Sequence, residues 1–272
     1  MSAKPGGVSI RPSRTTQFVL LATIGLVFAI PILGMIEFTL RGGLEGGYNL
    51  DHWVRVFSGE LDASYSRPLW AGVGNSLLLA ALTIVISFTL LVPTMVLVQL
   101  RFPKLRRALE FVCLIPITIP AIVLVVGLAP VFSVMARMFG SGVWTLAFAY
   151  GIIVLPFAYR AIQSNLAAID LVTLTEAARS LGANWVVAIW SVVIPNLRRG
   201  LLAAAFITIA VVLGEFTIAS LLNRPNLQTA LLLVSKADPF TAVIFALLSL
   251  AFGFALLFIL GRASARQIRR NP

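Results

Sequence analysis

Residues that could carry out chemistry are scarce in this chain of 272 residues. It contains a single cysteine, Cys113, and a single histidine, His52. One cysteine excludes a disulfide within the chain, and one residue of each kind cannot build a Cys/His zinc site. We therefore expect the chain to bind no metal ion and no cofactor. His52 lies in a hydrophilic connection, where we expect it to be solvated rather than catalytic.

The chain also lacks the loop that many ATPases use to bind phosphate. A P-loop requires glycine immediately before its lysine. The lysines of this chain are Lys4, Lys104 and Lys236, which follow alanine, proline and serine respectively. No P-loop can therefore be formed, and we do not expect the chain to be an enzyme that hydrolyses ATP.

The composition is that of a membrane protein. Apolar residues make up 59% of the chain and charged residues 11%, against about 25% charged residues in soluble proteins. A helix needs roughly 20 apolar residues to cross the hydrocarbon core. Six stretches are long enough, at 17–36, 69–100, 111–136, 138–159, 200–223 and 239–261. We predict an all-α, polytopic membrane bundle of six transmembrane helices, with 69–100 as one long helix.

The positive charges predict the orientation of this bundle, because lysine and arginine are concentrated in cytoplasmic segments. With the N-terminus inside, the cytoplasmic segments hold 15 of the 21 basic residues. Topology therefore explains the net charge of +11, and no nucleic-acid partner is expected. Both termini should be cytoplasmic. The predicted parts are a tail 1–16, a first transmembrane helix with its external loop 17–68, a core 69–261 and a second tail 262–272.

The longest connection, 160–199, carries the most specific pattern of the chain. Four apolar residues spaced as on one face of a helix indicate a short amphipathic helix at the cytoplasmic surface: Leu171, Leu174, Ala178 and Leu181. Gly182 is placed to end this helix in a left-handed conformation. Asn184 could cap a second short helix, which we expect to stop at Pro195. Thr173 and Glu176 have the spacing of a capping box, so Glu176 could also serve only to fix the start of the first helix.

This connection resembles the signature of membrane permease subunits of type I ATP-binding-cassette importers. That signature reads Glu-Ala-Ala, three residues, Gly, nine residues and then Ile-x-Leu-Pro. This chain has Glu176-Ala177-Ala178, then Gly182, then Val192-Val193-Ile194-Pro195, and it departs from the signature in Val192 and Ile194. Both changes keep the surface apolar.

The resemblance extends over about 69–261. Gly74-Asn75-Ser76 is similar to the start of the permease core, and Gly214-Glu215-Phe216-Thr217 is similar to the branch that imports spermidine and putrescine. Pro116 and Pro120 belong to the same likeness. Related branches carry phosphonates, ferric iron, thiamine, sulfate or molybdate, so the substrate stays open.

The resemblance implies a division of labour between subunits. Such permeases pair in the membrane, with a second copy or with a different permease chain, and the localisation implied is the bacterial inner membrane. Cytosolic ATPase subunits bind ATP and Mg²⁺, and an extracytoplasmic binding protein delivers the substrate. Glu176, Ala177, Ala178, Gly182 and Pro195 would then belong to the coupling element that docks on the ATPase.

Glu215 is the one charge that we place well inside a predicted span. A lone carboxylate there costs about 2.5–3.5 kcal/mol, so it should face protein or water rather than lipid. We assign it, with Asn75 and Thr208, to the translocation path. The alternative is that a hydrogen bond to Asn75 or Thr208 makes it a packing residue. Pro116, Pro120 and Pro130 are expected to kink the third span.

Other classes of protein fit the sequence less well. A membrane enzyme normally has several ionisable residues within its spans, and only one is predicted here. A self-sufficient secondary transporter usually has an inverted repeat, and no such repeat is visible. A membrane assembly subunit without transport activity remains a third alternative.

Overall fold

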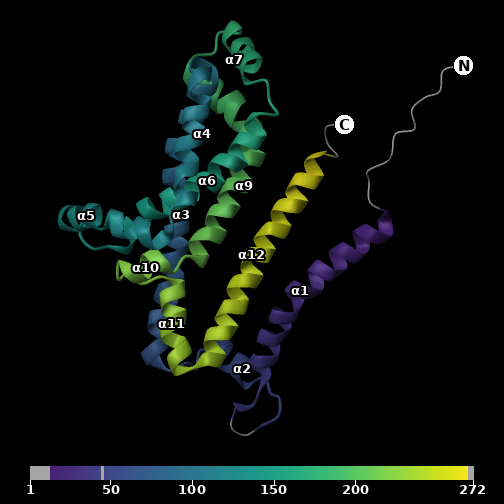
Figure 1. Ribbon diagram of the computed structural model, residues 1–272, viewed down its shortest axis with the longest axis vertical. Coiled ribbons are helices and arrows are strands. Elements are labelled where there is room, and N and C mark those ends of the chain that lie inside the picture. The colour runs from purple at the N-terminus through teal and green to yellow at the C-terminus, as the bar shows by residue number, and fades with distance from the viewer. Residues whose placement is uncertain (1–12, 44–45, 269–272) are drawn as a thin grey trace, which may run out of the picture.

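Helices make up nearly all of the structure, a computed structural model that describes residues 13–43 and 46–268. Six of its helical segments are long and apolar enough to cross a membrane. Figure 1 shows the helices running mainly along the long axis, with α7 at one end and α2 at the other. The longer helices are α1 (Arg14–Leu40), α3 (Ala63–Arg101), α5 (Ala121–Phe139), α6 (Leu146–Leu166), α9 (Ile194–Gly214) and α12 (Pro239–Ile268). The all-α membrane bundle predicted from the sequence is confirmed.

Shorter helices connect these six. They are α2 (Asp51–Ser58), α4 (Arg106–Leu114), α7 (Leu171–Ser180), α8 (Trp185–Ala188), α10 (Thr217–Leu221) and α11 (Leu227–Ala237). The stretch 69–100 lies within one helix, α3, as predicted, although α3 contains both Pro68 and Pro93.

The centre of the bundle is formed by α3, α6 and α9, which pack on one another along their lengths. Their buried faces carry apolar side chains such as Leu79, Tyr150 and Leu197. Gly200 of α9 allows α6 to approach closely, because a Cβ atom placed there would lie 2.8 Å from Cβ of Asn165. The bundle is therefore held by close helix packing, which a glycine permits where α9 crosses α6.

Helix α1 stands apart from this centre. It packs on α12 and α2, and none of the side chains in its most apolar 18-residue window is buried. Figure 1 shows α1 and α12 meeting at the α2 end and α1 lying beyond α12 from the central helices. The apolar surface of α1 thus faces outward, as expected of a helix surrounded by lipid or by another membrane subunit.

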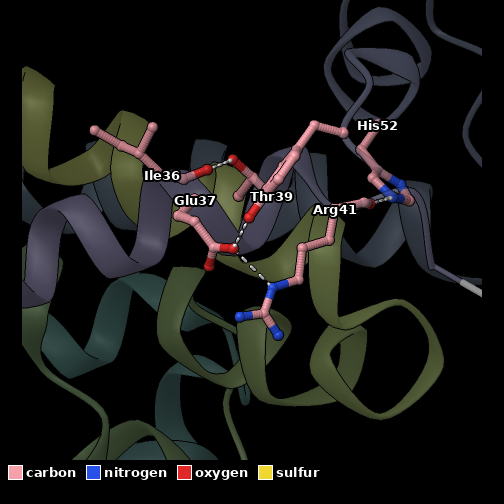
Figure 2. A network of polar contacts seen from close by, with 6 residues as sticks. Ile36, Glu37, Thr39, Arg41 and His52 are labelled. Atoms are coloured by element: carbon pink, nitrogen blue, oxygen red, sulfur yellow. Dashed lines mark hydrogen bonds and ion pairs between the residues drawn. The ribbon is translucent and has the colours of Figure 1, made fainter. Parts of the chain in front are cut away.

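The junction of α1, α2 and α12 is closed by polar and aromatic contacts around His52. One ring nitrogen lies 3.1 Å from the Arg41 carbonyl oxygen and the other 2.6 Å from the Arg55 guanidinium. The ring stacks on Phe240, with 4.0 Å between centroids. Figure 2 shows His52 beside Arg41 near the end of α1, where Arg41 also pairs with Glu37 at 3.0 Å. His52 is half-exposed, so its ring keeps contact with solvent, and it also joins the end of α1 to α2 and α12.

The third predicted span, 111–136, is not one kinked helix. Helix α4 ends at Leu114, a 3₁₀ turn follows, and α5 begins only after Pro120. Proline lacks a backbone N–H and disfavours the helical conformation of the residue before it, and Ile119 is indeed extended, with φ −101° and ψ 121°. Figure 1 shows α5 leaving the side of the bundle at this break.

The segment after Asn184 does not stop at Pro195, contrary to the prediction. Trp185–Gly214 is one continuous helical span, in which α8 passes through a π-helical segment, Ile189–Val193, into α9. The Ile194 N–H donates to the Ile189 carbonyl, five residues back. Pro195 lies in the first turn of α9, where a missing N–H is tolerated. The side chain of Asn196 donates to the Val192 carbonyl at 2.7 Å and so supports the junction.

The fifth predicted span, 200–223, is also interrupted. Helix α9 ends at Gly214, Glu215 is extended with φ −80° and ψ 120°, and α10 starts at Thr217. The connection that follows, predicted as an external loop, contains α11, which packs against α3 and α12.

Candidate functional site

The short helix α7 begins at an aspartate rather than at the predicted capping box. The Asp170 carboxylate accepts hydrogen bonds from the Thr173 N–H at 3.2 Å and from the Thr173 hydroxyl at 2.7 Å. These bonds hold the pKa of the Asp170 carboxyl below its usual value. The Glu176 carboxylate makes no hydrogen bond or ion pair with any residue that the structure describes. Glu176 is therefore not a cap, and its charge is available to another molecule.

The end of α7 is fixed by Gly182, as predicted. Gly182 has φ +90°, a conformation that residues with a side chain adopt only at a cost. The Ala183 N–H donates to the Ala178 carbonyl and the Gly182 N–H to the Arg179 carbonyl. These two bonds form a Schellman motif, which satisfies carbonyls that the helix itself leaves without partners.

One face of α7 is buried and the opposite face is open. Leu171 and Thr175 are 1% and 2% exposed, and the Thr175 hydroxyl donates to the Leu171 carbonyl. Glu176 and Ala177 lie on the exposed face, while Ala178 is half-buried. Leu181, expected on the buried stripe, is 89% exposed because the helix ends before it. The exposed face thus offers a carboxylate, a small residue and an apolar tip.

The buried face of α7 packs against the π-helical segment Ile189–Val193 and against α8 and α3. The π-helical segment continues into α9, which packs along α6. Helix α7 therefore contacts the start of a helical span that runs through the centre of the bundle to Gly214.

At the far end of α9, Glu215 closes the helix break. Its carboxylate accepts from the Ile218 N–H at 2.8 Å and from the Ala219 N–H at 3.3 Å, the second and third amides of α10. A negative charge at a helix start is favoured by the helix dipole. The side chain is half-buried, and it lies at the break between α9 and α10 rather than within a helix, where the sequence had placed it.

A residue that sequence reasoning missed, Asn226, organises this region. Its side chain is fully buried and donates to the Glu215 carbonyl at 2.6 Å and to the Tyr150 hydroxyl at 3.1 Å. It also accepts from the Thr229 N–H in a capping box that starts α11. The signal available in the sequence was Asn226 followed three residues later by Thr229, before an apolar run.

The other two predicted path residues do not hydrogen-bond with Glu215. The Asn75 amide donates to the Pro225 carbonyl at 2.9 Å. Pro225 directly precedes Asn226, so Asn75 lies beside the connection between α10 and α11 that Asn226 belongs to. The Thr208 hydroxyl is buried and donates to the Ala204 carbonyl of its own helix. Asn75 therefore lies near the break and Thr208 contributes to helix packing.

Among the residues that the structure describes, no group of three or more His, Cys, Asp or Glu side chains could hold a metal ion.

Comparison with known families covers the part of the chain that contains α7, α8 and α9. The model of the binding-protein-dependent transport system inner membrane component family matches residues 96–270, from the end of α3 through α12. The chain belongs to this family. The family is one of transport-system components in membranes rather than of enzymes, and the chain is accordingly a multi-pass membrane protein.

A curated relative points in the same direction. The probable ABC transporter permease protein y4fN of Sinorhizobium fredii is 26% identical over 219 residues. The match covers 74% of this chain and 38% of that protein. The chain therefore spans less than half the length of this relative.

The cap of α7 can be tested by hydrogen exchange. In the Asp170→Ala variant we expect faster amide exchange across Leu171–Ser180, because the Thr173 N–H loses its acceptor. The Glu176→Ala variant is the matched control and should exchange like the wild type. Since the pKa of Asp170 is lowered in the folded state, the cap contributes above the ordinary pKa of the carboxyl and is lost as the pH falls through the lowered value. Equal acceleration in both variants would contradict this assignment.

Proposed function

We propose that this chain is the membrane permease subunit of an ATP-binding-cassette importer. The observation that carries the proposal is α7, whose exposed face holds an unpaired carboxylate beside a small residue, at the end of a continuous helical connection into the bundle. In this role α7 docks on a separate ATPase subunit, which binds ATP and Mg²⁺. The chain's lack of a P-loop fits a subunit that takes its energy from another protein.

The other expected partners are a second permease and an extracytoplasmic binding protein. The matched segment makes up 38% of the Sinorhizobium relative, so that protein is long enough to hold a second stretch of this size. A pair of permease units, from two copies or from two different chains, is consistent with that length. The apolar surface of α1 that faces away from the central helices could contact the second unit or lipid.

We place the translocation path at the break between α9 and α10. Glu215, Asn226 and Asn75 bring polar groups together there, within an otherwise apolar bundle. The likeness of Gly214-Glu215-Phe216-Thr217 to the spermidine and putrescine branch makes a cationic substrate our proposal. The Glu215 carboxylate would supply the negative charge for such a substrate.

The alternatives differ in what drives or accompanies transport. A secondary transporter would move substrate in vesicles without ATP, and an assembly subunit would not transport at all. The helical connection from α7 to α9 favours the importer, because neither alternative requires an exposed, capped helix in that place.

Docking of α7 predicts a steric effect at its exposed face. Ala177→Trp should abolish co-purification of the ATPase and its stimulation by the loaded binding protein, because the bulky ring prevents close approach. Gly182→Val should also impair both, since valine disfavours φ +90°. Ala108→Trp, at an exposed alanine of α4, is the matched control. The measurements are pull-down of the ATPase and ATP hydrolysis in proteoliposomes. Normal association and stimulation in the Ala177 and Gly182 variants would refute docking through α7.

We propose that the chain lies in a bacterial inner membrane with both termini on the cytoplasmic side. In a Cys113→Ser background, Ser58→Cys in α2 should react with an impermeant thiol reagent added to sealed cells. Ser180→Cys in α7 should react only after the membrane is permeabilised. Both serines are exposed, so accessibility within the protein is comparable. Labelling of position 180 in sealed cells would reverse the topology.

The charge of Glu215 is tested by two substitutions. Glu215→Gln keeps an oxygen to accept the Ile218 N–H, so the folded protein should persist while transport falls at least tenfold. Glu215→Ala also removes the helix cap and should lower the free energy of unfolding by about 1 kcal/mol. Thermal unfolding in detergent and uptake in proteoliposomes separate the two effects. Wild-type uptake by the glutamine variant would exclude a required charge in the path.

A further inference from the structure

An apolar groove lies between α3 and the α8–α9 span at the α7 end of the bundle. It consists of two adjoining cavities of about 600 and 470 Å³. Both are lined by Pro93, Val96 and Ile189, which shows that they are neighbouring parts of one groove. Leu97 of α3 and Trp190 of the π-helical segment are exposed along its edge. The groove therefore opens on the outside of the bundle rather than toward its centre.

The lining would suit a hydrocarbon chain. Apart from the indole groups of Trp185 and Trp190, the one uncharged polar side chain in the lining is Thr89, and its hydroxyl donates to carbonyls of its own helix, those of Val85 and Ile86. It therefore demands no partner from a ligand. A groove of this kind on a membrane helix gains from apolar contact and needs no hydrogen bonds within it.

The mouth of the groove is different, because Arg101 lines it and both Arg101 and Arg179 lie close to the ring of Trp185. The guanidinium of Arg101, at the end of α3, lies 5.2 Å from the Trp185 ring centroid, and that of Arg179, in α7, lies 5.0 Å from it. Both arginines are exposed. Within residues 13–43 and 46–268, no carboxylate lies within ion-pair distance of either one.

Two cations drawn to one indole ring repel each other, and an anion placed with them would offset this repulsion. Basic sites between membrane helices at the cytoplasmic side are suited to anionic lipid head groups. An aromatic ring at the end of a span, such as that of Trp185, is typical of the membrane interface. The head-group level and the apolar groove are thus adjacent.

We infer that this groove binds an anionic phospholipid. One acyl chain lies between α3 and the α8–α9 span, and the phosphate lies between Arg101 and Arg179. Because Arg179 belongs to α7 and Arg101 to α3, the lipid joins the α7 element to a central helix of the bundle. Its affinity would then depend on the position of α7. The inference rests on the proposed orientation, which puts the α7 end at the cytoplasmic side, and does not rest on the proposed transport activity.

Lipid binding can be measured on the full-length chain, washed free of lipid in detergent, by native mass spectrometry. The probes are phosphatidylglycerol and phosphatidylcholine with identical acyl chains. We expect the wild type to bind phosphatidylglycerol at least tenfold more tightly. The double variant Arg101→Gln/Arg179→Gln should lose this preference, and Arg107→Gln/Arg198→Gln, with two exposed arginines outside the groove lining, should keep it.

The groove itself is tested by a pair of leucines on α3. Leu97, 52% exposed, lines the groove, while Leu90, 67% exposed, does not. Leu97→Trp should weaken phosphatidylglycerol binding at least fivefold, and Leu90→Trp should leave it unchanged. Equal binding of the two lipids by the wild type, or a retained preference in the Arg101/Arg179 variant, would overturn the inference. Displacement of the lipid by an equal concentration of soluble glycerol phosphate would also overturn it, because a free anion site needs no groove.

Discussion

A peptide backbone in a membrane must satisfy its own hydrogen-bonding groups, and the structure depends on how it does so where helices stop. At the α9–α10 break, the Glu215 carboxylate accepts two backbone N–H groups and Asn226 donates to the Glu215 carbonyl. On the adjoining connection, Ser76 of α3 accepts the Leu227 N–H. Polar side chains here therefore hold an irregular backbone inside an apolar bundle, and this requirement explains their presence before any functional role is considered.

The same polar groups also determine where a charged substrate could be bound within the bundle. Glu215 has its charge beside a break because the break needs acceptors, and the break in turn leaves polar groups close together. A structural role and a role in transport are therefore not exclusive for this residue. A side chain that satisfies backbone amides through one set of lone pairs can still present a charge to a substrate.

Helix α9 connects two regions that would otherwise be independent. It begins at the π-helical segment against which α7 packs, and it ends at Gly214, directly before Glu215. The π-helical segment allows Pro195 to be accommodated without ending the helix, because the N–H of Ile194 bonds five residues back. As a result, the surface element and the break in the bundle are joined through one helical span rather than by a flexible loop.

The sequence alone determined the membrane class, the number of spans, the single long helix over 69–100, and the end of α7 at Gly182. These properties follow from the length of the apolar stretches and from the backbone preferences of individual residues. Such preferences act only over a few neighbouring positions and can therefore be recognised in the sequence. The site was less accessible to such reasoning. The helix breaks after Leu114 and Gly214, the continuation through Pro195, the choice of Asp170 as the cap of α7 and the linking role of Asn226 became visible only in the tertiary structure. The cap at Asp170 is a local contact, three residues from Thr173, but several local residues could have served as the cap. The contact of Asn226 with Tyr150 joins residues 76 positions apart, and such a separation leaves no periodic trace in the sequence.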